Sequence, residues 1–177
     1  MPLNLINIDS KTRNLMVSEI NQDIQNSQLY LSKRFNANGQ ALYPDLLQEA
    51  AKNHDDAWLA LQLRTKNMFK TEEQKRTPSG KTTTAKVPTN AADTFAEGEF
   101  NRFYIRAICL RAIEEGNSRV KVYRAHHRDN PRPESQSKIG EMIDAKKLLS
   151  DLRSNPGVDL ALGIPSGPNS GLSVQLP

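Results

Sequence analysis

The segment AADTFAEGEFNRFYIRAICLRAIEEG (residues 91–116) decides the fold, because it is the only long stretch of the chain that is both helix-forming and strongly apolar. Its apolar side chains recur at spacings of three and four residues, as on one face of a helix. They are Phe100, Phe103, Tyr104, Ala107, Ile108 and Ala112, and Ile105, Cys109, Leu110 and Ile113 widen the stripe. A helix that is apolar on more than one side needs cover on more than one side, so we expect residues 91–116 to form the core helix.

Both ends of this segment carry residues that helix ends favour. Thr89, Asn90 or Asp93 can cap the start, where a side-chain oxygen accepts from free backbone N–H groups. Gly116, followed by Asn117, suits the left-handed conformation that ends many helices. Local chemistry therefore defines both bounds of the core helix.

Composition predicts a modest core with long peripheral segments. Leu, Ile, Val and Phe make up 40 of the 177 residues, just above the range in which disorder becomes the default. This length suits one domain or two small ones. The formal net charge of +4 and the pI near 9.2 favour polyanions or acidic protein surfaces as partners without requiring them.

The single cysteine and the N-terminal residues indicate the cellular compartment in which the chain is expected. Cys109 lies in the apolar run, so we expect a small buried hydrophobe rather than a nucleophile, and no disulfide can form within the chain. The first ten residues lack a basic start followed by an apolar block, and no stretch approaches about 18 apolar residues. We therefore expect neither secretion nor membrane insertion, with synthesis in the cytoplasm.

Residues 1–69 are expected to form an N-terminal helical subdomain. Residues 3–8 alternate roughly between apolar and polar side chains, which fits a short strand or an arm lying on a partner. Three helices are predicted after it: residues 11–25 capped by Asp9 or Ser10, residues 44–52 starting at Pro44, and residues 56–68 opened by Asp55 and Asp56. The turn signal at residues 36–39 predicts a small hairpin or loop between the first two helices.

Residues 70–90, KTEEQKRTPSGKTTTAKVPTN, differ abruptly in composition from both neighbouring segments. The tract has two prolines, no aromatic residue and no run that could bury a face. We therefore expect an extended basic linker. Lys75, Arg76 and Lys81 within it are candidates for contact with phosphates or an acidic surface, although a solvated linker would have the same composition.

Residues 91–177 are expected to form a C-terminal α+β unit around the core helix. Residues 119–123 (RVKVY) alternate as a strand does, with two valines inward. A polar loop leads to a helix capped by Asp144, and residues 172–176 alternate like a final strand that could pair with residues 119–123. The predicted fold class is α+β and predominantly helical, with a helix, strand, helix, strand order and an extended tail.

Motifs for catalysis, cofactors or metals do not rise above background. SGKT (residues 79–82) matches the end of a phosphate-binding loop, but Lys75 stands where that motif needs a glycine and no strand precedes the loop. His126 and His127 are adjacent, so in an extended segment their rings point to opposite sides and do not share an ion. We therefore expect no catalytic residue, no cofactor and no metal.

A second group of basic residues begins on the core helix. Arg102 and Arg106 lie four residues apart, with Glu99 before them, which is typical of a charge ladder on a helix surface. The basic character continues into the strand and loop that follow, in Arg119, Lys121, Arg124 and Arg128. Together these residues are the best candidates for contact with nucleic acid or an acidic protein, although no recognition-helix, RNA-binding-sheet or finger motif accompanies them.

Two stretches carry a resemblance to known proteins: TNAADTFAEGEFNRFYIRAICLRAIEEG (residues 89–116) and NPGVDLALGIPSGPNSGLSVQLP (residues 155–177). Here the sequence resembles small proteins of unassigned function that tailed bacteriophages and prophages encode, often among head and packaging genes. The resemblance covers mainly the C-terminal half and rests on no motif with known chemistry. It implies a virion or head-associated setting, and it carries over no functional residue.

These observations predict a non-enzymatic structural protein, a head or head-associated subunit of a phage-type particle. It would bind neighbouring protein subunits through extended arms, in several copies, and would be located in the virion or, before assembly, in the cytoplasm. The alternative is a small basic nucleic-acid-binding protein that uses the arginine and lysine residues named above. A third hypothesis is a small enzyme whose site escapes motif analysis.

Overall fold

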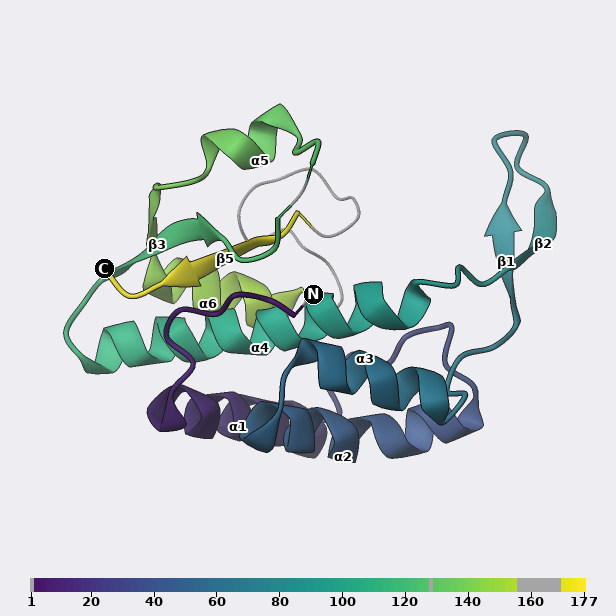
Figure 1. Cartoon of the computed structure of the whole chain (residues 1–177), viewed down its shortest axis with the longest axis horizontal. Helices are drawn as coiled ribbons and strands as arrows, with labels where there is room; N and C mark the ends of the chain where they lie inside the picture. The colour runs from purple at the N-terminus through teal and green to yellow at the C-terminus, as the bar shows by residue number, and fades with distance from the viewer. Residues whose placement is uncertain (1, 128, 156–169) are drawn as a thin grey trace.

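The computed structural model describes residues 2–127, 129–155 and 170–177, so most of the predicted Gly- and Pro-rich tail lies outside the described residues. Within them the fold is α+β with helices predominating, as predicted (Figure 1). The helices are α1 (Ser10–Gln25), α2 (Ala37–Asn53), α3 (Asp56–Thr65), α4 (Ala91–Glu114), α5 (Pro133–Ser137) and α6 (Ala145–Ser154). The strands are β1 (Glu72–Arg76), β2 (Thr82–Lys86), β3 (Arg119–Arg124), β4 (Met142–Asp144) and β5 (Leu172–Gln175).

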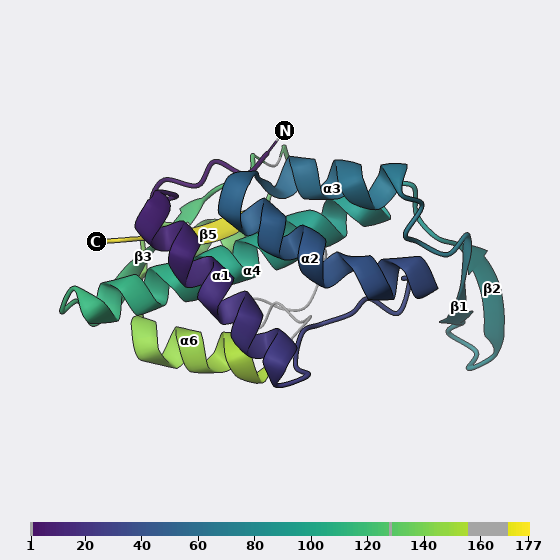
Figure 2. The same cartoon turned by 90° about the horizontal axis from the view of Figure 1, so that it is seen from below.

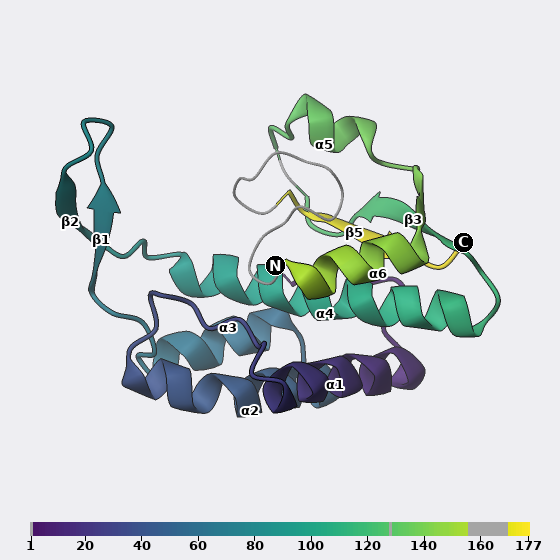
Figure 3. The same ribbon diagram turned by 180° about the vertical axis from the view of Figure 1, so that it is seen from behind.

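Helix α4 is the core helix that the sequence predicts, and it lies between two layers. Helices α1, α2 and α3 cover one side (Figure 2), and α6 with the sheet that contains β3 and β5 covers the other (Figure 3). Fifteen of its 24 residues are buried, so it does need cover on several sides. Asn90 takes the N-cap position without a side-chain capping bond, and Gly116, with φ of 80°, ends the helix in the predicted left-handed conformation.

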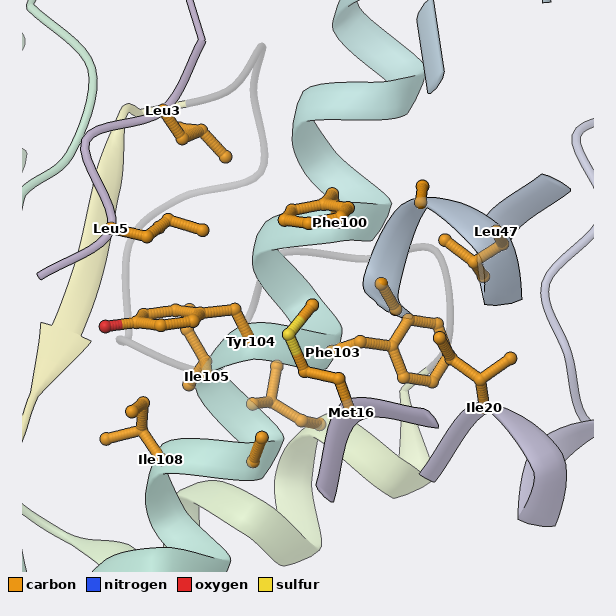
Figure 4. Packing of buried hydrophobic residues seen from close by; sticks show 14 of the residues in the cluster. Leu3, Leu5, Met16, Ile20, Leu47, Phe100, Phe103, Tyr104, Ile105 and Ile108 are labelled. Atoms are coloured by element: carbon orange, nitrogen blue, oxygen red, sulfur yellow. The ribbon is translucent and has the colours of Figure 1, made fainter. Parts of the chain in front are cut away.

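Side chains from distant parts of the chain meet on α4. Figure 4 shows Met16 and Ile20 of α1 and Leu47 of α2 beside Phe103, all of them buried. The same hydrophobic cluster includes Val120, Val122 and Val174 of the sheet on the other side. The core is therefore continuous across the expected boundary between an N-terminal subdomain and a C-terminal unit.

The N-terminal segment lies on the chain's own C-terminal half. Asn4 N donates to Ala125 O at 2.8 Å, and the Tyr123 hydroxyl donates to Asn4 O at 2.9 Å. Leu3 N donates to the Asp56 carboxylate of α3 at 2.9 Å. Residues 3–8 do not form a strand, which was one of the two expectations, and these bonds hold the segment against the chain's own body.

Helix α2 begins at the expected turn, which corrects the predicted start at Pro44. Asn36 Oδ1 accepts from Gly39 N at 2.9 Å, so Asn36 caps the helix and Pro44 falls inside it. Burial of the neighbouring Tyr43 in the core outweighs the local cost of an interior proline. A side chain at Gly39 would place its Cβ 2.4 Å from Met68 O, so close packing requires glycine here.

The three-stranded sheet has the order β4-β3-β5 and is antiparallel throughout. The predicted pairing of the first and last strands of this half is confirmed, with Val122 opposite Val174. The short elements β4 and α5 were not predicted, because three and five residues carry too little periodicity. The predicted caps are confirmed at Asp9, Asp55 and Asp144, each of which accepts from a backbone N–H in the first turn of its helix.

Candidate interaction surface

Strands β1 and β2 form a hairpin that projects from the helical body, where the sequence predicted an unpaired linker (Figures 1 and 3). The turn is closed by Thr77 N donating to Lys81 O at 2.8 Å, and Gly80 adopts the left-handed conformation with φ of 81°. Threonines favour strands, and the turn residues are those that a hairpin needs. The linker prediction was wrong because it required apolar alternation, which an exposed hairpin does not have.

The hairpin is attached to the body only at its base. No side chain of β1 or β2 is buried. At the base, Arg34 Nε lies 2.6 Å and Arg34 Nη2 lies 2.9 Å from the two Glu73 carboxylate oxygens, a bidentate pair. Lys70 N donates to Arg34 O at 2.8 Å on the same side. An isolated two-stranded hairpin is marginally stable in water, so its order depends on what covers it.

An aromatic cluster fixes the point where the hairpin leaves the body. Phe35 and Phe69 form an isolated antiparallel bridge, and their ring centroids lie 5.0 Å apart. Phe95 of α4 packs edge-on against Phe35 at 4.9 Å and against Tyr43 at 5.1 Å. The base is therefore well packed even though the strands beyond it are exposed.

The outer half of the hairpin gathers three of the predicted contact residues. Lys75 and Arg76 end β1 and Lys81 closes the turn, and all three side chains are exposed. Lys75 Nζ lies 3.4 Å from Glu73 Oε1 near the base. Lys75 and Arg76 are neighbours in a strand and point to opposite faces, so the outer half of the hairpin carries cationic groups on both faces that can meet phosphate or carboxylate groups.

Arg102 and Arg106 do not belong to any contact surface, which corrects the predicted ladder. Arg106 is 1% exposed; its Nη1 lies 2.6 Å from Asp23 Oδ2 and its Nη2 lies 2.6 Å from Glu19 Oε2, both on α1. Arg102 is 8% exposed, and its Nη1 donates to Asn155 O at 2.9 Å beyond the end of α6. Both guanidinium groups join helices to one another, because a buried charge must be paired.

The sequence carries a partial signal for the Arg106 site, although it does not pair Arg106 with its acidic partners. Glu19 and Asp23 are four residues apart, so they share one face of a helix, and Arg106 falls in the middle of an apolar stripe. Arg153 of α6 also reaches Glu19, with Nη2 2.5 Å from Oε1. Burial works to raise the pKa of Glu19, and the two arginines more than offset it, so that this pKa is lowered.

The remaining basic candidates are dispersed. Arg119 and Lys121 are exposed on β3, at the other end of α4 from the hairpin (Figure 1). Arg124 Nη1 donates to Ser170 O at 2.8 Å, and Arg124 Nη2 donates to Gln136 Oε1 at 3.2 Å. Arg128 lies outside the described residues. The structure therefore places Lys75, Arg76 and Lys81 on the outer half of one hairpin, divided between its two faces, and it does not assemble the other described candidates into one patch.

A cavity of about 410 Å³ lies along the N-terminal half of α4, between the loop at Ser32 and the start of β5. Its lining includes Glu99 and Asn101 of α4, and Glu99 Oε2 and Asn101 Oδ1 have no hydrogen-bond partner among the described residues. Burial raises the pKa of Glu99 against the opposing charge of Arg102. This carboxyl therefore holds a proton more readily than a free glutamic acid does, but the described lining residues offer it no evident reaction partner.

The other chemically notable groups do not converge. Burial raises the pKa of the Cys109 thiol to about 12, as suits a core residue. His126 Nδ1 lies 3.1 Å from Glu97 Oε2, whereas the exposed His127 lies 3.3 Å from Asp129 Oδ1. Over residues 2–127, 129–155 and 170–177, no three side chains of the metal-binding types come together. In the same residues no helix has the length and apolar character needed to cross a membrane.

Comparison of the sequence with known protein families, with curated proteins and with solved structures found no match.

Proposed function

We propose that the protein is a non-enzymatic structural subunit of a phage-type particle, associated with the head, and that it binds neighbouring subunits through the β1–β2 hairpin. The observation that carries this proposal is a hairpin with both faces exposed, fixed to the body only at its base. A hairpin of this kind gains most of its stability from a surface that covers it. Extended elements that become ordered on a partner are a common mode of subunit assembly.

The composition of the hairpin suits a subunit that is free before it assembles. The side chains of its two strands are charged residues, three threonines, one glutamine and one alanine, so the free hairpin exposes no apolar patch that would cause aggregation. The cationic tip favours a neighbour with an acidic surface. The phage setting rests on the resemblance of the C-terminal half to small phage and prophage proteins.

The test is a shortened variant in which an Asn-Gly turn replaces residues 74–84, so that Glu73 and Ala85 flank a two-residue turn. Glu73 stays in place and can keep its pair with Arg34, and no buried side chain is removed. We expect thermal unfolding like that of the parent and loss of co-sedimentation with particles. A variant with Arg119→Ala and Lys121→Ala, exposed on the other end of the body, is the control and should still co-sediment. If the shortened chain co-sediments with particles as well as the parent does, the proposal is wrong.

A second function, nucleic-acid binding, is favoured by one specific observation: three exposed cations lie on the outer half of the hairpin. Binding through them would weaken steeply with salt, because phosphate contacts release counterions. A variant with Lys75→Gln, Arg76→Gln and Lys81→Gln should then lower the slope of log K against log salt by roughly 3. No binding of the parent to DNA at low salt would remove this function and leave the structural proposal standing.

A further inference from the structure

We propose that the outer edge of β2 pairs with β2 of a second copy of this chain, across a two-fold axis, to form a four-stranded antiparallel sheet. This inference rests on the proposed function and names one neighbour in the assembly. It is carried by the different chemistry of the two strands and by the direction of their backbone groups.

The two edges of the hairpin differ in charge. Strand β1 (EEQKR) carries four charged side chains in five residues, whereas β2 (TTTAK) carries none before Lys86. Charged residues and proline are the features by which proteins protect an edge strand from pairing with another chain. Residues 82–85 have neither, and three of the four are β-branched threonines, which favour strands. β1 is thus the protected edge and β2 the open one.

The hydrogen bonds at the two ends of the hairpin show which backbone groups point outward. Thr77 N donates to Lys81 O at 2.8 Å and Val87 N donates to Thr71 O at 2.9 Å, so both pairs are of the hydrogen-bonded kind. Such pairs alternate with non-bonded pairs along an antiparallel ladder. The intervening register makes Gln74 and Thr84 a non-bonded pair. The N–H and C=O groups of Thr82, Thr84 and Lys86 therefore point away from β1, toward the open edge.

A two-fold axis at Thr84 satisfies all of these groups at once. Thr84 lies opposite Thr84 of the second copy, and Thr82 lies opposite its Lys86, each as a hydrogen-bonded pair. This register keeps the two Lys86 side chains away from each other, so no like charges are paired. A strand that complements itself in this way gives an isologous contact, the usual form of a homodimer. The second copy also adds two strands to a hairpin that is marginal alone.

The test uses proline at two positions that face each other in the hairpin. Thr84→Pro removes an N–H on the open edge, whereas Gln74→Pro removes the equivalent N–H on the protected edge. Both variants lose the same side-chain bond, from Gln74 Nε2 to Thr84 Oγ1 at 3.0 Å, which makes them a matched pair. Dimerisation is measured by sedimentation equilibrium. We expect Thr84→Pro to raise the dimer Kd about tenfold or more, since it removes two bonds per dimer, and Gln74→Pro to leave the Kd unchanged.

A second measurement reads the register directly. Thr84→Cys places two thiols across the axis at the Cα separation of a hydrogen-bonded pair, about 5.5 Å, which a disulfide can span. Mild oxidation should convert this variant to a covalent dimer and leave Gln74→Cys without a cross-link; the native Cys109 is buried and does not interfere. A parent that stays monomeric at high concentration, or two proline variants that behave alike, would overturn this pairing. The proposed function fails separately, if the shortened hairpin variant still co-sediments with particles.

Discussion

Arg106 and Asp23 form a bidentate ion pair inside the core, with Nη1 2.6 Å from Oδ2 and Nη2 2.8 Å from Oδ1. Glu19 accepts from Nε of the same guanidinium at 2.7 Å. Arg106 Cζ also lies 4.8 Å from the Phe103 ring centroid, in the geometry of a cation–π contact. One side chain of α4 thus fixes the position of α1 against the core helix.

Removing the guanidinium should be strongly destabilising. Arg106→Leu leaves Asp23 buried without its arginine partner and leaves Glu19 with Arg153 alone, and we expect the free energy of unfolding to fall by about 3–5 kcal/mol. Urea denaturation of the variant and the parent measures this loss. Adding Glu19→Leu and Asp23→Leu should restore most of it, because a well-packed apolar replacement avoids desolvating charges. If the triple variant does not recover stability, packing around the site, and not charge pairing, accounts for the loss in the free energy of unfolding.

The cavity carboxyl should make stability depend on pH. Burial raises the pKa of Glu99 above its ordinary value of 4.5, so between these two values the folded chain binds more protons than the unfolded chain. The contribution of Glu99 to stability is therefore highest in acid and falls as pH rises above about 4.5. Glu99→Gln does not titrate, so it should gain on the parent between pH 4 and pH 7 in urea denaturation. A difference between the two proteins that does not change with pH would contradict the raised pKa.

Gly171 should be more sensitive to substitution than Gly140, although both have a positive φ, 73° and 89°. Alanine at either position should destabilise the folded chain by roughly 1–2 kcal/mol, because the left-handed conformation brings its Cβ too close to the backbone. At Gly171 the new Cβ would also lie 2.5 Å from His126 O, whereas nothing lies within 4 Å at Gly140. Thermal unfolding should rank the parent above Gly140→Ala, and that variant above Gly171→Ala. Equal unfolding temperatures of the two variants would mean that the backbone at His126 shifts to relieve the contact with the new Cβ.

The elements that could be predicted from the sequence are those with local signals. Asp9, Asp55 and Asp144 each cap the helix that follows, and the alternation of residues 119–123 and 172–176 is enough to place two paired strands. Burial of Arg106 could not be read in the same way, because its partners are 83 and 87 residues away. A charged residue on a helix belongs to the surface or to the core according to what faces it, which the fold alone decides.

The candidate site was predicted in composition but not in structure. Lys75, Arg76 and Lys81 are identified from their charge, and the structure places them on one exposed hairpin. Their hairpin was missed because the usual strand signal is a buried face, and β1 and β2 have none. The turn residues Pro78 and Gly80, followed by three threonines, were the available signal.

The pair between Arg34 and Glu73 should control how firmly the hairpin is held. It is the bidentate contact that joins β1 to the loop before α2, and it lies beside the aromatic cluster. Arg34→Glu puts two carboxylates together, so the hairpin base should open more often while the core helices keep their packing. Hydrogen exchange should then be faster at the amides of β1 and β2 and unchanged in α1 and α4. The double variant Arg34→Glu with Glu73→Arg reverses the pair and should restore most of the protection. If hydrogen exchange at the amides of β1 and β2 is unchanged in Arg34→Glu, the Phe35–Phe69 bridge holds the base without the ion pair. In that case Arg34→Glu should also bind particles as the parent does.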